Sequence, residues 1–372
     1  MFKIKKQINT LYLTSILGNL SITGAWVAIL AARGFSLVQI GFAETVFHIT
    51  SLIFEIPSGL MADVYGRKKM LLLSNLMTAL AGIIMAMTDG FTGVCISFVF
   101  HALGYNFASG SGDALAYDSY KLVNMEDQYE RYASNQLIIY RVTSSISTLC
   151  AGLALLIGYK PAYLISAAWS LFTMLVGFRL VEVRPDTAQE EKRESETKGI
   201  LKKMFFDVIN YFKESLLFLI RNPKASKLMF ANSFVGAIDI LLLFFLQSKL
   251  RTTGISDLTL GIALFIMELG GIAGAKLILK AKKTRYAHLF IICTCGVIAG
   301  VLLEHTSIAV LMTLGGFISS MADDALQIRT DAKLQDSFPS EQRATLISIS
   351  SFTFSVIMIA LSPLAGFFFE MW

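Results

Sequence analysis

Long apolar runs separated by short polar stretches dominate this chain. A helix that crosses a bilayer needs roughly 20 mostly apolar residues, because unpaired backbone groups are costly in hydrocarbon. Eleven segments meet that requirement, at about residues 9–31, 37–58, 70–88, 93–117, 134–157, 161–181, 226–248, 257–280, 287–303, 306–328 and 344–369. The ninth is short, and the fourth and tenth carry acidic residues near their ends. The pattern predicts an all-α integral membrane protein.

Composition supports this prediction. The chain has 372 residues, of which 55% are hydrophobic and only 16% are charged, which is far more apolar than a soluble domain. The first segment is too long for the core of a signal peptide and lacks a small-residue cleavage site, so we expect it to remain as the first span.

Basic residues indicate the orientation in the membrane, since cytoplasmic loops are rich in Lys and Arg. They concentrate in the N-terminal tail, in the loop after the second segment, between residues 182 and 200, and between residues 280 and 285. We therefore expect a plasma-membrane protein with a cytoplasmic N-terminus. The net charge of +5 follows from these loops, and no continuous basic stripe suggests nucleic-acid binding.

The sequence predicts no disulfide, metal site, cofactor or catalytic activity. The four cysteines all lie in apolar segments, and we assign them no disulfide and no metal. No phosphate-binding Gly-Lys-Ser/Thr loop occurs, so neither ATP nor another cofactor is expected. The histidines are not accompanied by a nucleophile motif, so we predict that the protein is not an enzyme.

The chain contains an internal repeat. The sequence from Asp113 to Asp118, at the end of the fourth segment, matches that from Asp324 to Arg329 at the end of the tenth. A highly charged stretch separates the two halves and precedes an amphipathic helix near residues 200–219. These features predict an N-terminal bundle of six helices (1–181), a cytoplasmic linker with its amphipathic helix (182–224), and a C-terminal bundle of five helices (225–372).

The loop between the second and third segments reads Gly-Leu-Met-Ala-Asp-Val-Tyr-Gly-Arg-Lys-Lys over residues 59–69. This short polar hinge resembles the signature loop of the major facilitator superfamily, and the likeness extends over nearly the whole chain. It implies two helix bundles around a central cavity that opens alternately to each side of the membrane. The second bundle is one helix shorter than the family's six, which implies either a shortened transporter or a truncated, non-transporting protein that acts as a scaffold or inactive product.

The resemblance assigns a conformational latch to the signature loop. The residues concerned are Gly59, Asp63, Gly66, Arg67 and Asp118. Asp63 would meet the start of the eleventh segment near residues 341–345, and Arg67 would pair with Asp118. The alternative is that these residues only fix the loop topology, although topology alone requires cations and no aspartate.

Ionisable side chains inside apolar segments are costly and are functional by default. The candidates for proton coupling or a substrate cavity are Glu44, His48, His101, Asp113, Arg141, Asp239 and Glu268. Glu44 and His48 are four residues apart and can share a helix face, which suits proton coupling, although Glu44 is also close enough to the segment end to be a solvated acid. Arg141 either neutralises Asp113 or contacts an anionic substrate.

These features together predict a secondary active transporter that exports an amphipathic or drug-like small molecule by alternating access. Protons are the expected coupling ion, the lipid bilayer and a small-molecule substrate are the expected partners, and a monomer is the expected state.

Overall fold

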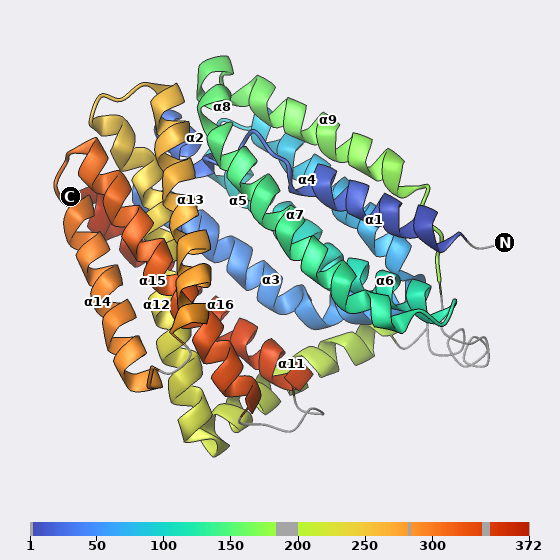
Figure 1. Ribbon diagram of the computed structural model, residues 1–372. Helices are drawn as coiled ribbons and strands as arrows, with labels where there is room; N and C mark the ends of the chain where they lie inside the picture. The colour runs from blue at the N-terminus through green and yellow to red at the C-terminus, as the bar shows by residue number, and fades with distance from the viewer. Residues whose placement is uncertain (1–2, 184–199, 282–283, 337–342, 372) are drawn as a thin grey trace. The chain divides into compact units, whose positions relative to one another are not determined.

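A computed structural model of the chain describes residues 3–183, 200–281, 284–336 and 343–371, in which all regular structure is helical (Figure 1). The all-α prediction is therefore confirmed. Packing contacts divide the chain into two compact units. Unit 1 comprises Met1–Ser21, Ile49–Ser147 and Tyr159–Glu214, and unit 2 comprises Ile22–His48, Thr148–Gly158 and Ser215–Trp372.

The units interleave along the sequence, because two segments of the first half, Ile22–His48 and Thr148–Gly158, pack with helices of the second half. The division at residues 182–224 was drawn from the repeat and stays a prediction.

Unit 1 is built around α4. Its helices are α1 (Ile4–Asn19), the second part of α3 (Leu37–Tyr65), α4 (Arg67–Met87), α5 (Phe91–Ala108), α6 (Ser111–Lys121), the 3-10 turn η1 (Glu126–Gln128), most of α7 (Tyr129–Leu149), α9 (Tyr159–Gly177) and the first part of α11 (Ile200–Arg221). Helix α4 packs along both α5 and α9. Gly82 and Gly104 permit these approaches, since a Cβ at Gly82 would lie 3.0 Å from the carbonyl oxygen of Tyr163.

Unit 2 is built around α15. Its helices are α2 (Trp26–Ala32), the first part of α3, α8 (Ala151–Ile157), α12 (Pro223–Thr252), α13 (Asp257–Lys280), α14 (Tyr286–Glu304), α15 (Ala309–Asp336) and α16 (Arg343–Met371). Helices α13 and α14 both pack along α15 (Figure 1). Gly270 and Gly274 of α13 meet the backbone of Phe317 and Met321 so closely that a Cβ at either position would overlap a carbonyl oxygen.

Every predicted segment is occupied by a helix, with three differences in detail. Nine helical segments among the described residues are long and apolar enough to cross a membrane, with α5–α6 and α7–α8 each counted as one; α1, α2 and α9 are not among them. Three predicted segments each consist of two helices: 9–31 is formed by α1 and α2, 93–117 by α5 and α6, and 134–157 by α7 and α8. Helix α15 continues to Asp336 instead of ending near residue 328.

The break between α1 and α2 is stabilised by side chains of other helices. The Ser147 hydroxyl accepts a hydrogen bond from the backbone N–H of Ser21 at 2.9 Å and donates one to the carbonyl of Asn19 at 3.2 Å. The Trp169 indole N–H donates to the carbonyl of Leu17 at 2.8 Å. Backbone groups freed at a helix end need such partners inside a membrane. Because Ser147 and Trp169 supply them, the segment predicted as one uninterrupted span can form two helices.

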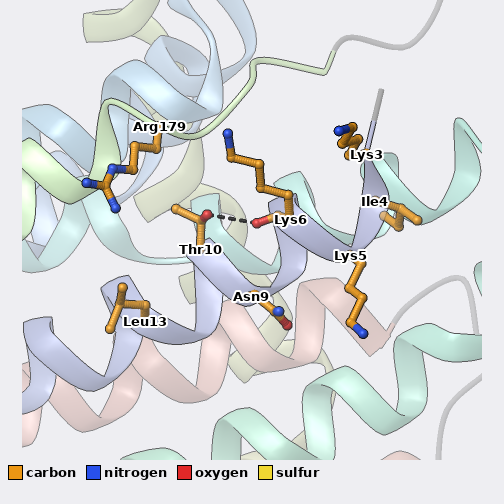
Figure 2. A pocket seen from close by; sticks show the side chains of 8 residues that line it. All are labelled: Lys3, Ile4, Lys5, Lys6, Asn9, Thr10, Leu13 and Arg179. Atoms are coloured by element: carbon orange, nitrogen blue, oxygen red, sulfur yellow. Dashed lines mark hydrogen bonds between the residues drawn. The ribbon is translucent and has the colours of Figure 1, made fainter. Parts of the chain in front are cut away.

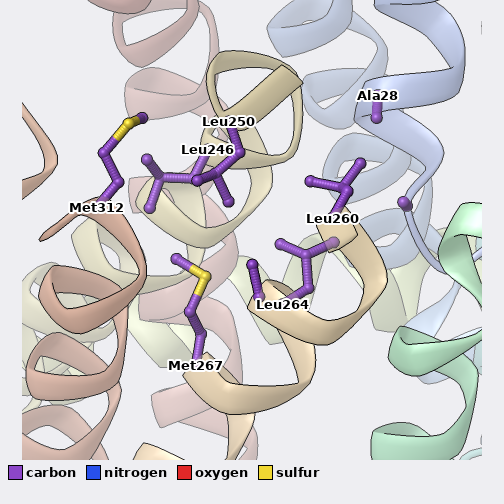
Figure 3. Packing of buried hydrophobic residues seen from close by; sticks show 9 residues of the cluster. Ala28, Leu246, Leu250, Leu260, Leu264, Met267 and Met312 are labelled. Atoms are coloured by element: carbon purple, nitrogen blue, oxygen red, sulfur yellow. The ribbon is translucent and has the colours of Figure 1, made fainter. Parts of the chain in front are cut away.

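Within unit 2, segments of the first half of the sequence form a contact layer with helices of the second half. Helix α2 packs on α12, and α8 packs on α13. The buried core of this layer is apolar, with Ala28 from α2, Leu246 from α12, Leu260 and Met267 from α13, and Met312 from α15 (Figure 3). One polar link crosses it, because the N–H of Val27 at the start of α2 donates to Gln247 Oε1 at 3.1 Å.

Glycines let the backbones in this layer touch. A Cβ on Gly152 of α8 would overlap the carbonyl oxygen of Asp257, and a Cβ on Gly261 of α13 would overlap that of Leu149. The same relation holds at Gly41 of α3 against Ser362 and at Gly366 of α16 against Leu37. Lipid removes most of the hydrophobic driving force between helices, so close packing through small residues stabilises such contacts instead.

Proline creates a second polar link in the contact layer. Pro363 lies inside α16 and has no N–H to donate to the carbonyl of Ile359, four residues earlier. The Thr45 hydroxyl of α3 donates to that carbonyl at 3.1 Å. The carbonyl that Pro363 leaves without its helical donor thus accepts a hydrogen bond from a hydroxyl of another helix.

The substitution Gly261→Ala is expected to destabilise the protein by about 1–3 kcal/mol, because the added methyl meets a backbone atom that cannot rotate away. The measurement is the melting temperature of the purified chain in detergent. The control is Gly112→Ala, since Gly112 lies in a helix with nothing within 4 Å of the added carbon. Alanine favours a helix over glycine by about 1 kcal/mol, so the control should melt no lower than the parent chain. Equal melting temperatures of the two variants would contradict the close contact.

Candidate functional site

The signature loop forms a tight turn between α3 and α4. Gly66 precedes the first residue of α4 with φ 102°, a conformation that side chains other than glycine rarely adopt. A Cβ at this position would also lie 2.5 Å from Glu182 Oε2. The backbone conformation therefore favours glycine at this turn, and a larger residue would also displace the Glu182 carboxylate.

Arg67 and Asp118 are brought together as predicted. Their side chains form an ion pair in unit 1, and the Arg67 guanidinium also donates to the carbonyl of Ala114 at 3.1 Å. Asp118 is 9% exposed and lies in α6, so the pair links the start of α4 to α6. A partly buried charge-assisted contact of this kind is stronger than one between solvated side chains.

Glu182 is a part of this cluster that the sequence interpretation missed. Its two carboxylate oxygens accept hydrogen bonds from the backbone N–H groups of Arg67 and Lys68, both at 3.0 Å. The carboxylate thus caps α4 at the end where the helix dipole favours negative charge. Glu182 was grouped with the linker because charged residues follow it, and no local pattern announces a cap that is more than 100 residues distant in sequence.

The segment that carries Glu182 is held in place by Gln7. The Gln7 side-chain amide donates to the carbonyl of Val181 at 2.8 Å, and its oxygen accepts from the Val181 N–H at 3.0 Å. Gln7 is buried, and Leu180 and Val183 pack in the same apolar cluster as Leu115. The chain after α9 is therefore fixed as far as Val183.

The other two latch candidates lie close to the turn. Asp63 and Gly59 are exposed on the last turns of α3. Residues 341 and 342, where Asp63 was expected to find part of its partner, lie outside the described residues. The role of Asp63 as a latch stays a prediction.

Glu44 and His48 form a buried pair in unit 2. His48 Nε2 lies 3.4 Å from Glu44 Oε1, and each residue is 8% exposed. The His48 ring packs edge-on against Phe354 of α16 with ring centroids 5.8 Å apart. The pair is thus enclosed where α3 meets α16, and the alternative of a solvated Glu44 does not hold.

The candidates in unit 1 are more scattered. His101 is exposed on α5, and Asp113 is exposed on the first turn of α6, just after the left-handed Gly110 that separates it from α5. Asp113 makes no ion pair with any described residue and lies near Tyr129 and Tyr132. Arg141 therefore does not neutralise Asp113 in this structure.

A group of acidic side chains lies in unit 2. Asp239 of α12 faces Ser319, Ser320 and Asp324 of α15 and lies within electrostatic reach of Glu268 of α13. Glu268 is partly exposed, whereas Asp239 is 4% exposed. Both candidates lie near the middle of their helices, as the sequence predicted.

Two further acids complete this cluster. Asp323 is 3% exposed, and it accepts a hydrogen bond from Gln327 at 3.2 Å on one oxygen. Gly236 of α12 allows the close approach, since a Cβ there would lie 2.8 Å from Gln327 Nε2 and 3.4 Å from Asp323 Oδ1. Glu304, at the end of α14, is fully buried and within electrostatic reach of Asp239.

We refer to Asp239, Glu268, Glu304, Asp323 and Asp324 as the acidic cluster. Several of its oxygens have no hydrogen-bond partner among the described residues. They are Asp239 Oδ1, Asp323 Oδ1 and both carboxylate oxygens of Glu304, together with the hydroxyls of Ser319 and Ser320.

Lys and Arg are absent from the parts of α12 and α15 that carry most of these acids. The sequence contains neither Lys nor Arg between residues 228 and 248 of α12 or between residues 309 and 327 of α15. An ionised carboxylate buried without a cationic partner costs several kcal/mol, which makes a bound proton or another cation favourable at Asp239, Asp323 and Glu304. Among the described residues, no three His, Cys, Asp or Glu side chains are arranged to hold a metal ion.

The sequence interpretation missed Asp323 and Glu304 for identifiable reasons. The tenth segment was expected to end near residue 328, which placed its acids at a membrane boundary, whereas α15 extends to Asp336 and puts Asp323 mid-helix. Glu304 follows the predicted end of the ninth segment directly. A signal for Asp323 was present, because adjacent acids within a long apolar run are unusual.

Comparison with known proteins assigns the family. Residues 8–372 match the family model described as Major Facilitator Superfamily. A Bacillus subtilis (strain 168) protein described as the uncharacterized MFS-type transporter YxaM is 24% identical over 336 residues, which covers 88% of this chain and 79% of that protein.

Solved structures show the same fold. The nucleoside transporter NupG superposes with a TM-score of 0.73 at 15% identity, covering 98% of this chain and 91% of that one. A D-xylose-proton symporter superposes with a TM-score of 0.71 at 14% identity, covering 98% and 90% respectively.

Replacing Glu182 with glutamine should lower stability by about 1 kcal/mol, because the amide keeps only one acceptor oxygen and loses the charge that favours the start of α4. The measurement is again the melting temperature in detergent. Glu126→Gln removes an equal charge from an exposed position of unit 1 and should leave the melting temperature unchanged. If both variants melt alike, Glu182 does not act as a cap.

Proposed function

Because the chain belongs to the Major Facilitator Superfamily of membrane transporters, we propose that it is a proton-coupled secondary transporter that exports an amphipathic small molecule by alternating access. It would lie in the plasma membrane with its N-terminus in the cytoplasm, and the Lys and Arg residues concentrated in the predicted cytoplasmic loops support that orientation.

The acidic cluster is the observation that carries the proposal. Asp239 and Asp323 are buried, have oxygens without partners and lie mid-helix in α12 and α15. Such groups are expensive to keep in a membrane protein, and this cost is typical of residues that carry ions or protons. Proton binding and release at these carboxylates would couple the cluster to the proton gradient.

The charge of the cluster also favours one class of cargo. A buried group of acids attracts positive charge, and a cationic amphiphile would compete with protons for the same carboxylates. Competition of this kind gives exchange of the cargo for protons. The Glu44–His48 pair is a second group that could take up a proton, because its two members are already in contact in a buried place.

The contact layer supports alternating access. It joins the two halves of the sequence through glycine contacts and apolar side chains, with only a few hydrogen bonds such as Thr45 to Ile359. Apolar and glycine contacts of this type can separate without breaking ion pairs between the helices. The Arg67–Asp118 pair and the Glu182 cap lie instead within unit 1, so they would keep the signature loop rigid while other parts move.

Transport is best measured in liposomes that contain the purified chain and a pH-sensitive dye. The panel should include lipophilic cations, a lipophilic anion of similar size, a nucleoside and D-xylose. We expect proton movement driven by lipophilic cations only. Proton movement driven by the nucleoside or the sugar would show a different substrate class.

The matched variants are Asp239→Asn and Asp257→Asn. Each removes one carboxylate from unit 2, but Asp257 lies at the first turn of α13 and pairs with Arg251 at 3.1 Å, outside the acidic cluster. Asp239→Asn should abolish substrate-driven proton flux and melt no lower than the parent chain, because it removes an unpaired buried acid. Asp257→Asn should transport and melt slightly lower. Full transport by Asp239→Asn would overturn coupling through this residue.

A further inference from the structure

Unit 1 carries a basic groove beside the start of α1. Its volume is about 680 Å³, it is open to the surroundings, and it is lined by Lys3, Ile4, Lys5, Lys6, Asn9, Thr10, Leu13 and Arg179 (Figure 2). Figure 2 shows Lys3, Lys6 and Arg179 extending toward the same side of α1, while Lys5 extends away from them. The groove therefore combines two segments that are distant in sequence, α1 and the chain just after α9.

The cations of this groove have no anionic partner. None of the four basic side chains makes an ion pair with any residue that the structure describes. A further cation lies close by, because Lys68 Nζ donates to the carbonyl of Phe178, the residue before Arg179. The position of Arg179 is fixed by its neighbours, since Leu180 is buried and Val181 is held by Gln7.

Polarity changes along one face of α1. Lys6, Asn9, Leu13 and Ile16 recur at helical spacing, so they form one stripe that runs from charged through polar to apolar. Leu13 is 40% exposed and Ile16 is 37% exposed. With a rise of about 1.5 Å per residue, the apolar end lies roughly 15 Å from the charged end.

We propose that this groove binds the headgroup of an anionic phospholipid. Lys6 and Arg179 would hold the phosphate, Asn9 would offer a hydrogen bond beside it, and the acyl chains would lie along Leu13 and Ile16. A headgroup phosphate followed by apolar chains matches the order of charge, polarity and exposed apolar surface on this stripe. A soluble phosphate compound would use the cations but not the apolar end.

The experiment uses the purified full-length chain in a neutral detergent. Binding of short-chain dioctanoyl phosphatidylglycerol is measured by titration, for example from the rise in melting temperature or by native mass spectrometry. Dioctanoyl phosphatidylcholine has equal chains without net charge, and glycerol 3-phosphate has the phosphate without chains. Phosphatidylglycerol should bind more tightly than either.

The variant Lys6→Gln/Arg179→Gln should bind phosphatidylglycerol about 30-fold more weakly, since each cation at an anionic surface contributes roughly a fivefold change. The control Lys121→Gln/Arg131→Gln removes two exposed cations of unit 1 that do not line the groove, and it should bind like the parent chain. Lys6→Arg/Arg179→Lys keeps both charges and should retain binding, which separates loss of charge from loss of structure.

Three results would overturn the proposal. Equal binding by the Gln variant and its control would show that the groove is not the site. Equal affinity for phosphatidylcholine would show that the anionic charge is not recognised. Glycerol 3-phosphate bound as tightly as the lipid would assign the groove to a soluble phosphate compound. None of these results depends on whether the protein moves protons, so they are independent of the proposed transport mechanism.

Discussion

The cost of an unpaired polar group in a membrane interior is the constraint on which this structure depends. Backbone groups freed where α1 ends are satisfied by Ser147 and Trp169, and the carbonyl that Pro363 leaves free accepts from Thr45. These two interruptions are thus compensated by side chains from elsewhere in the same unit. Irregular backbone can therefore occur at membrane depth without destabilising the bundle.

The acidic cluster departs from this rule. Around Asp239 and Asp323, carboxylates and hydroxyls share a buried space with few donors and no Lys or Arg of α12 or α15. Close packing does not lower the free-energy cost of burying these acids, because Gly236 lets α12 approach Asp323 closely and so keeps the carboxylates near one another. Buried acids that cost stability in this way are typical of sites where membrane proteins bind protons or ions, which is the basis of the transport mechanism proposed above.

Near the start of α4, unlike in the acidic cluster, the charged side chains of Arg67, Asp118 and Glu182 have partners. Arg67 pairs with Asp118, and Glu182 accepts from the first two backbone N–H groups of α4. These partners come from α6 and from the chain after α9, so one helix start organises three parts of unit 1. The groove cations beside it, among them Lys6 and Arg179, are left without partners in the described chain. The same region therefore offers both a rigid support and an unsatisfied positive surface.

The sequence by itself determined the helical class, the approximate helix positions and the signature turn at Gly66, while the Arg67–Asp118 pair was expected from the resemblance to the family. Apolar length and local charge spacing are properties of a single segment, so they can be read along the chain. The tertiary structure alone decided where α1 breaks, that Glu182 caps α4, that α8 packs on α13, and that Asp323 and Glu304 join Asp239. Each of these depends on a partner far away in sequence, and hydropathy carries no information about which residues will meet.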